Sequence, residues 1–226
     1  MNVLGSAVAP FQWIATVRHR RVFHPNGVLA TGSIERVAAD GAGLPIESAA
    51  DVLVRISKGI GMPGALPDVS GLALRLPPNA SSATPWDVLL ASAAGGPAGR
   101  MAVRPAVRWS GQSMSSVMPL RYAGANWWLR ARISTDIGGI GVSLDSIRKY
   151  LRQGHLDVDI DQARGWGPFR PLARLTVNAA LPSDDSDDVA FEPVLNVPPG
   201  VQLVPHWLAA LRKQAYRDSR HGRQAD

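Results

Sequence analysis

The segment 52–91 reads VLVRISKGIGMPGALPDVSGLALRLPPNASSATPWDVLLA, and it contains three short runs in which apolar and polar residues alternate. These runs are Val52–Ser57, Leu72–Leu76 and Trp86–Ala91, and Gly, Pro and Ser residues separate them. An alternation with a period of two, interrupted by turn-forming residues, is typical of strands with one buried face. The segment therefore predicts three consecutive β-strands.

Similar runs occur on both sides of this segment. They are Val28–Val37 (VLATGSIERV), in which Gly32 predicts a bend, Asn126–Ser134 (NWWLRARIS) and Leu172–Leu181 (LARLTVNAAL). About six to eight strands with few helices favour an antiparallel β-barrel or a β-sandwich. Glycines within strands, and two adjacent tryptophans, suit a curved and closed sheet.

Two helices are predicted. The first covers Leu144–Gln153, and Ser143 before it can cap its amino terminus. The second runs from His206 to about Ser219; it follows Pro205, and Gly222 lies just beyond its expected end. Together with the strands, these helices give a fold that is mainly β with some α structure.

The remaining segments predict loops. The acidic stretch Ser183–Asp188 is expected to be a solvated loop, and GGPAG at 95–99 a flexible connection. Neither a repeat nor a visible domain boundary interrupts the 226 residues, so we expect a single domain over 1–226.

The composition excludes several classes of protein. The chain has no cysteine, which excludes disulfide scaffolds, thiolate metal sites and cysteine nucleophiles. Apolar residues precede the first charges at the amino terminus, the reverse of a secretory signal, so we expect a cytoplasmic protein. No apolar run approaches the roughly 18 residues of a membrane span, so no membrane partner is expected.

The net charge of +6 allows an anionic partner. Arginine dominates the basic residues, and its planar guanidinium group suits carboxylates and phosphates, although a GC-rich genome would give the same bias. No motif of aromatic and basic residues supports nucleic-acid binding, so no nucleic-acid partner is expected. No P-loop, dinucleotide fingerprint or common hydrolase motif is found.

The predicted carboxy-terminal helix carries the most specific pattern. Arg212, Tyr216, Arg220 and Arg223 are spaced to lie within roughly an 80° arc of one helix face. Cations one turn from a phenol stabilise its phenolate form, which is a hard anionic ligand suited to ferric iron. The alternative interpretation is a basic helix face that happens to carry a tyrosine.

Five short blocks resemble the haem catalase superfamily, in the order in which that family carries them. They are RVFHPNG at 21–27 with Gly32 and Glu35 after it, VRIS at 54–57, Asp68 with GLA at 71–73, WDVL at 86–89, and RKQAYRDSR at 212–220. The blocks cover the barrel and the proximal helix of that family. The resemblance implies a minimal catalase-like β-barrel with a C-terminal proximal helix, lacking the arm, the wrapping segment and the helical domain of longer catalases.

The resemblance implies haem b as the cofactor, with Tyr216 as the proximal iron ligand. Arg212 would hydrogen-bond the phenolate oxygen, and Arg220 would lie near it. His24 would be the distal acid and base that moves a proton between the peroxide oxygens, and Ser57 would orient the His24 ring. The haem propionates would be bound by three guanidinium groups, those of Arg21, Arg55 and Arg223.

One position departs from the family pattern. The family carries a second distal residue, an asparagine, a few residues after its Trp-Asp block, and the matching position here is Ser92. A hydroxyl offers one donor where an amide offers two. We therefore expect weak catalase activity and more substantial peroxidase activity.

The sequence thus predicts a haem-dependent peroxidase or catalase-like enzyme whose partners are a peroxide, either hydrogen peroxide or an organic hydroperoxide, and an unknown reductant. The alternative is a non-catalytic protein of the same fold that binds haem or another hydrophobic ligand. The sequence leaves the oligomeric state open, with a homodimer among the options.

Overall fold

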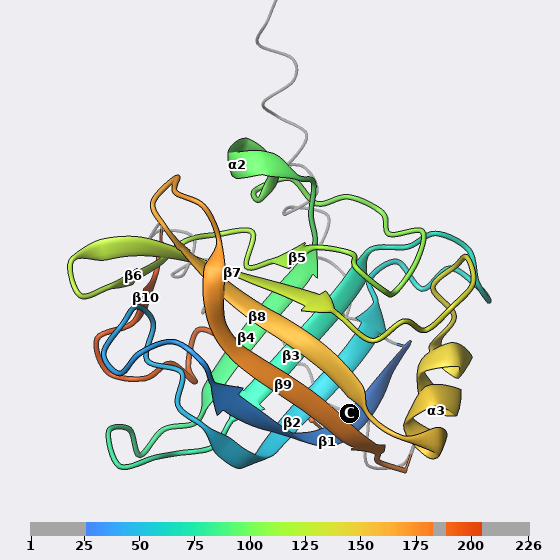
Figure 1. Ribbon diagram of the computed structural model, residues 1–226, viewed down its shortest axis with the longest axis horizontal. Coiled ribbons are helices and arrows are strands. Elements are labelled where there is room, and N and C mark those ends of the chain that lie inside the picture. The colour runs from blue at the N-terminus through green and yellow to red at the C-terminus, as the bar shows by residue number, and fades with distance from the viewer. Residues whose placement is uncertain (1–25, 183–188, 205–226) are drawn as a thin grey trace, which may run out of the picture.

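The computed structural model describes residues 26–182 and 189–204, and eight strands in it close into an antiparallel β-barrel (Figure 1). The ring runs β1-β2-β3-β4-β5-β7-β8-β9, and β9 pairs with β1 to close it. The barrel strands are β1 (Asn26–Arg36), β2 (Ala49–Lys58), β3 (Ser70–Leu76), β4 (Trp86–Ser92), β5 (Met114–Ser115), β7 (Ala125–Ile133), β8 (Leu156–Arg164) and β9 (Arg170–Ala180). Two short strands, β6 (Leu120–Tyr122) and β10 (Gln202–Leu203), extend the sheet beside β7.

Side chains at every second strand position fill the barrel interior. In β2, Val52, Val54 and Ile56 are buried in the core. The register pairs Val54 with Leu74 of β3, and Leu74 in turn with Val88 of β4, so these three side chains share one layer. Because successive side chains alternate across a strand, the residues between them point to the outside of the barrel.

The six predicted strands are confirmed, and so is the bend in the first. The register of β1 shifts next to Gly32 against both of its neighbours. A Cβ atom at Gly32 would lie 2.5 Å from the carbonyl oxygen of Thr176, so only glycine allows β1 and β9 to approach this closely. The bulge lets the sheet curve enough to close.

Strand β8 was not predicted, although its sequence LDVDIDQAR alternates clearly. Leu156, Val158 and Ile160 point into the core. Asp159 and Asp161 lie opposite Arg132 and Arg130 of β7. The aspartates lower the strand propensity of the segment, but cross-strand pairing with arginines compensates for this.

The first predicted helix is confirmed as α3 (Leu144–Gln153). The hydroxyl of Ser143 accepts a hydrogen bond from the Asp145 amide at 3.3 Å, which caps the helix. Ile147 and Leu151 are buried where α3 packs against the barrel. No helix among the described residues is long and apolar enough to cross a membrane.

The predicted flexible connection at 95–99 is partly helical, and two further predictions lie outside the described residues. GGPAG is not a plain connection, because Gly96–Gly99 forms a short helical turn, α2. Its proline stands in the first turn, where its fixed φ angle suits a helix and its missing N–H is not needed. The predicted helix from His206 to Ser219 and the acidic loop Ser183–Asp188 lie outside the described residues.

One end of the barrel is closed by the loop between β1 and β2. The Arg36 guanidinium group donates to four backbone oxygens of this loop, those of Ala39, Ala42, Leu44 and Ile46, over 2.7–3.1 Å. Leu44 and Ile46 are fully buried as a result. This arginine therefore closes the barrel mouth with aliphatic side chains.

The opposite end carries the loop 59–68, and two buried charges organise it. Lys58 Nζ donates to the carbonyl oxygens of Met62, Gly64 and Leu66 at 2.5, 2.9 and 3.4 Å. The Asp68 carboxylate accepts hydrogen bonds from three successive backbone amides, those of residues 60–62, over 2.7–2.9 Å. The two side chains together satisfy most of the backbone groups that this loop turns inward.

Replacing Asp68 by Asn should destabilise the protein by roughly 2–4 kcal/mol, because buried amide donors then face an amide group with only one acceptor oxygen. Urea unfolding, followed by circular dichroism, measures the change. Asp51→Asn is the matched control on an exposed strand position, and it should change the free energy of unfolding by less than about 0.5 kcal/mol. Equal effects of the two variants would contradict the assigned role of Asp68.

Candidate functional site

The outer face of β1–β4 is the candidate functional surface, because it is buried although it lies outside the barrel. The strand register sets its side chains in rows. One row runs Gly27–Ser57–Gly71–Ala91, and the next runs Leu29–Arg55–Ala73–Leu89. Leu29 is only 1% exposed and Ser57 only 2%. Only the first row consists of small residues, so a planar group could approach the strands along that row, whereas larger side chains line the second.

Ser57 lies at the centre of the first row. Glycines flank it on both neighbouring strands, Gly27 on β1 and Gly71 on β3. Its hydroxyl donates a hydrogen bond to the Gly71 carbonyl oxygen at 3.5 Å. The oxygen lone pairs of a serine that donates in this way remain able to accept a hydrogen bond from another group.

Arg55 lies next to Ser57 on the same face, two residues back along β2. Its side chain lies over Gly27, because a Cβ atom at that glycine would be 2.7 Å from Arg55 Nε and 3.2 Å from the Cβ atom of Ser57. The missing side chain at Gly27 therefore makes the space that Arg55 occupies. The structure thus brings Ser57 and Arg55 together on one face of β2.

The structure does not bring Ser92 to this surface. Trp86, Val88 and Leu90 of β4 point into the core. Because side chains alternate along a strand, Ser92 also points inward and Ala91 points outward. The Ser92 hydroxyl accepts from the Ser70 amide at 3.1 Å and donates to the Arg104 carbonyl oxygen at 2.5 Å. Ser92 therefore joins β3 to the loop after β4, and the residue on Ser57's face is Ala91.

The other predicted site residues cannot be placed in this way. Arg21, His24, Arg212, Tyr216, Arg220 and Arg223 all lie outside the described residues. Among the residues that are described, no group of three or more His, Asp or Glu side chains could hold a metal ion. Of the predicted site residues, the described part of the chain contains only Arg55, Ser57 and Ser92, and we call the outer face of β1–β4 the candidate wall.

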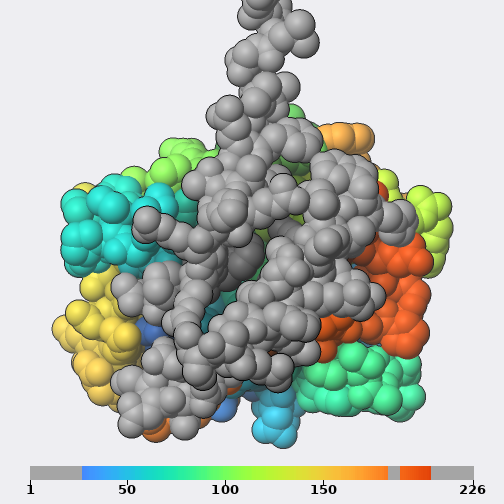
Figure 2. All heavy atoms as spheres, turned by 180° about the vertical axis from the view of Figure 1, so that it is seen from behind, coloured from blue at the N-terminus to red at the C-terminus, as the bar shows by residue number. Residues whose placement is uncertain are grey.

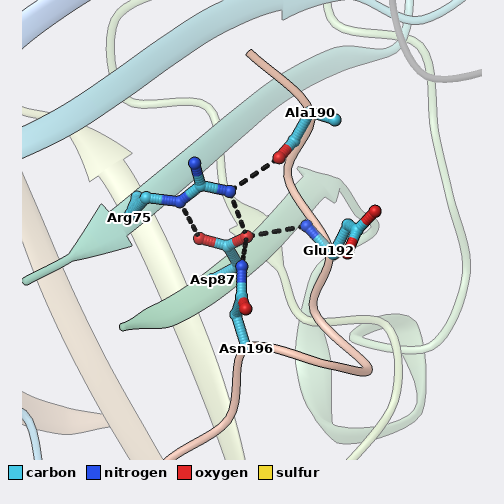
Figure 3. Close-up of polar contacts among 5 residues, drawn as sticks. All are labelled: Arg75, Asp87, Ala190, Glu192 and Asn196. Atoms are coloured by element: carbon cyan, nitrogen blue, oxygen red, sulfur yellow. Dashed lines mark hydrogen bonds and ion pairs between the residues drawn. The ribbon is translucent and has the colours of Figure 1, made fainter. Parts of the chain in front are cut away.

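Asp87 fixes the edge of this wall (Figure 3). Its carboxylate is fully buried and forms a two-point ion pair with Arg75, with both N–O distances at 2.7 Å. It also accepts hydrogen bonds from the Glu192 amide at 2.7 Å and from the Asn196 side chain at 2.8 Å. The hydrogen bond to Asp87 raises the pKa of Arg75, although partial burial of the guanidinium group opposes this.

The segment 190–196 is therefore attached to the outer face at the row Leu53–Arg75–Asp87. Arg75 donates a further hydrogen bond to the Ala190 carbonyl oxygen at 2.6 Å and lies over the Phe191 ring, 5.2 Å from its centre. Asp87 belongs to the WDVL block. No sequence pattern predicted that its carboxylate would bind a segment about 100 residues later in the chain. The block thus has a structural role in the described part of the chain.

Sequence reasoning also missed Ser115. It continues the Ser57 row beyond Ala91, it is buried, and its hydroxyl accepts a hydrogen bond from the Val117 amide at 3.2 Å. Strand β5 has only two residues, so no alternation marks it in the sequence. Ser115 adds a polar group to the outer surface that only the pairing of β4 with β5 reveals.

Two pockets near β4 are too small for a large ligand. Their volumes are about 30 and 80 Å³, and Trp86 lines both. Sites for small organic ligands are usually several hundred Å³. Within the described residues, the extended surface of β1–β4 is thus a better candidate for a large planar ligand than either pocket.

Arginines on the far side of the barrel have protein partners of their own. Arg130 pairs with Asp161 at 2.6 Å and lies over the Phe169 ring. Arg100 is buried between Phe169 and Trp128 and donates to the Gly165 and Gly167 carbonyl oxygens. Burial, and to a lesser extent nearby Arg130, lowers the pKa of Arg100. Part of the arginine excess is therefore structural.

Comparison with known proteins adds no relative. No protein-family model matches the chain, and no curated protein matches it.

If Arg75 and Asp87 act as one unit, their effects on stability should not add. Asp87→Ala alone should cost about 3 kcal/mol, and Arg75→Met alone should cost a similar amount by leaving a buried carboxylate without its cation. The double variant should cost clearly less than the sum. Urea unfolding of the four proteins gives this coupling free energy.

The exposed pair Arg148–Asp145 provides the comparison, since its charges are 2.9 Å apart at (i, i+3) on α3. Its coupling should stay below about 0.5 kcal/mol. A coupling for Arg75 and Asp87 no larger than this would show that the two residues do not act as one unit.

Proposed function

We propose that the protein is a haem-dependent peroxidase that acts on hydrogen peroxide or an organic hydroperoxide. The main support is the outer face of β1–β4, where Ser57 stands in a row of small residues and Arg55 lies beside it. These are the two described residues for which the sequence resemblance implied contacts with the distal histidine and the haem.

The row through Ser57 offers a place for a haem. It carries Gly27, Gly71 and Ala91, so an aromatic macrocycle could lie close to the strands there. Arg55 would bind a propionate, and Arg21 and Arg223 would do the same from segments outside the described residues. When bound, the haem would supply the two electrons that reduce a peroxide to an alcohol or water, and a reductant would return them.

Ser57 is suited to orient His24. Its proton is directed at the Gly71 carbonyl oxygen, so its lone pairs can accept the N–H of an imidazole. His24 stands only three residues before Gly27 in the sequence, and three residues span at most about 11 Å. Held in this way, His24 would take a proton from one peroxide oxygen and return it to the other as the O–O bond breaks.

Tyr216 would bind the iron on the opposite side as a phenolate, stabilised by Arg212 and Arg220. The position of Ala91 supports peroxidase rather than catalase activity. Across Gly71 from Ser57, where a second distal donor could stand, β4 presents a methyl group, and Ser92 faces the barrel interior. The same observation favours, as second candidate, a protein that binds haem or another hydrophobic ligand without turnover.

The iron ligand can be tested by visible spectroscopy of the full chain, expressed with haem supplied. The wild-type protein should show a Soret band, and Tyr216→Phe should lose it or shift it because the phenolate ligand is gone. Tyr150→Phe is the matched control. The Tyr150 hydroxyl donates a hydrogen bond to the Asp136 carbonyl oxygen, in the loop that precedes α3. A wild-type protein without a Soret band would overturn the haem proposal.

The acid–base group can be tested separately. His24→Ala should keep the Soret band but lose roughly 10²–10⁴-fold in peroxidase kcat/KM, because proton transfer then has no positioned group. Ser57→Ala should lose less and change the pH profile, since it acts only through the histidine. Unchanged turnover in His24→Ala with haem still bound would show that His24 is not the distal acid and base, whereas a wild-type protein that binds haem without any turnover would favour the non-catalytic candidate.

A further inference from the structure

Five large aliphatic side chains are exposed together at one end of the barrel. They are Ile60, Met62, Leu66, Val107 and Ile140, and Ile140 is 89% exposed. They belong to the loop 59–68 and to two loops beside it, and we call this set the apolar loop patch. Single exposed aliphatic residues are ordinary, but a cluster on adjacent loops indicates a surface that is covered by a partner.

Backbone hydrogen bonds join the three loops. Asp68 and Ala106 exchange two of them, at 2.7 and 3.2 Å. The Gly141 amide donates to Val107 O at 2.7 Å, and the Val142 amide donates to Ala65 O at 3.2 Å. Both views show these loops gathered at the end of the barrel nearest α3 (Figures 1 and 2). The patch is therefore a fixed surface rather than three independent loops.

The polar backbone of the loop 59–68 is turned away from its apolar side chains. Lys58 binds three of its carbonyl oxygens, and Asp68 binds three of its amides. Both charged side chains are buried beneath the loop. Internal pairing of this kind removes much of the cost of placing a loop in an apolar environment, where unpaired backbone groups are unfavourable.

Cations outnumber carboxylates beside the apolar loop patch. Its segments 60–67 and 103–108 contain no acidic residue and carry the exposed Arg104 and Arg108. The exposed Asp136 precedes the tip that carries Ile140, and its carboxylate accepts a hydrogen bond from the Gly138 amide at 2.9 Å. Exposed aliphatic tips beside cations are complementary to a membrane surface with anionic headgroups, whose boundary accepts both kinds of group.

We infer that the apolar loop patch docks the protein reversibly on an anionic lipid surface. Ile140 and Ile60 enter the boundary between headgroups and acyl chains, and Arg104 and Arg108 face the lipid phosphates. The glycine-rich tip Gly138–Gly141 projects outward, and a projecting tip inserts into deformable lipid more readily than it packs on a rigid protein face. Docking of this kind needs no spanning helix.

Co-flotation of the full chain with vesicles tests the inference and requires neither haem nor turnover. Vesicles of equal parts phosphatidylcholine and phosphatidylserine should bind the protein, and vesicles of phosphatidylcholine alone should bind it more weakly. The double variant Ile60→Ser/Ile140→Ser should lose about tenfold or more in apparent partition coefficient, because two aliphatic side chains no longer leave water. Arg108→Gln should weaken binding to the vesicles that contain phosphatidylserine and leave binding to pure phosphatidylcholine vesicles unchanged.

Val37→Ser is the matched control, because Val37 is an aliphatic residue of similar exposure at the opposite end of the barrel. It should leave vesicle binding unchanged, and near-ultraviolet circular dichroism should show that all variants are folded. Binding that survives in the double serine variant, or no wild-type binding, would overturn the inference. A second result would also overturn it: the wild-type protein forms a dimer in sedimentation velocity, does not bind vesicles, and loses the dimer in the double variant. The partner on the patch would then be a second copy of the chain.

Discussion

The ion pair between Arg75 and Asp87 connects parts of the chain that the barrel alone would leave apart. Its carboxylate stands on the outside of a closed sheet and is nevertheless fully buried, because segment 190–196 lies over it (Figure 3). A buried carboxylate needs several donors to offset its lost hydration, and here Arg75 of β3 and the late segment provide them. The interaction therefore holds the late segment over the outer surface at Asp87.

Much of the fold could be predicted from the sequence because a barrel of this kind follows one rule, the alternation of inward and outward side chains. Val52–Ser57 and Leu72–Leu76 show the rule clearly and were placed within a few residues of β2 and β3. Strand β8 obeys the rule too, but its outward residues are aspartates, which are typical of loops. The arginines opposite them, Arg130 and Arg132 of β7, are not visible in the local sequence. Strand β5 is too short to show any period.

The same rule explains why the candidate site was only partly predictable. A motif match fixes a residue to within one position, but one position moves a strand side chain to the other face of the sheet. Ser57 and Arg55 lie on the outer face, whereas Ser92 falls on the inner face and Ala91 takes the outer one. Ser115 and the apolar loop patch depend on contacts between distant segments, which no local pattern contains.

The position of Lys58 has a chemical consequence. The chain has only three lysines, Lys58, Lys149 and Lys213, and the amine of Lys58 is enclosed by three carbonyl oxygens beneath the loop 59–68. An amine-directed reagent reaches a lysine only when its nitrogen is accessible, and this enclosure opposes access. Lys58 is thus an internal reporter of local opening. The rate of its acylation, compared with that of exposed Lys149, would measure how often this end of the barrel opens while the rest stays folded.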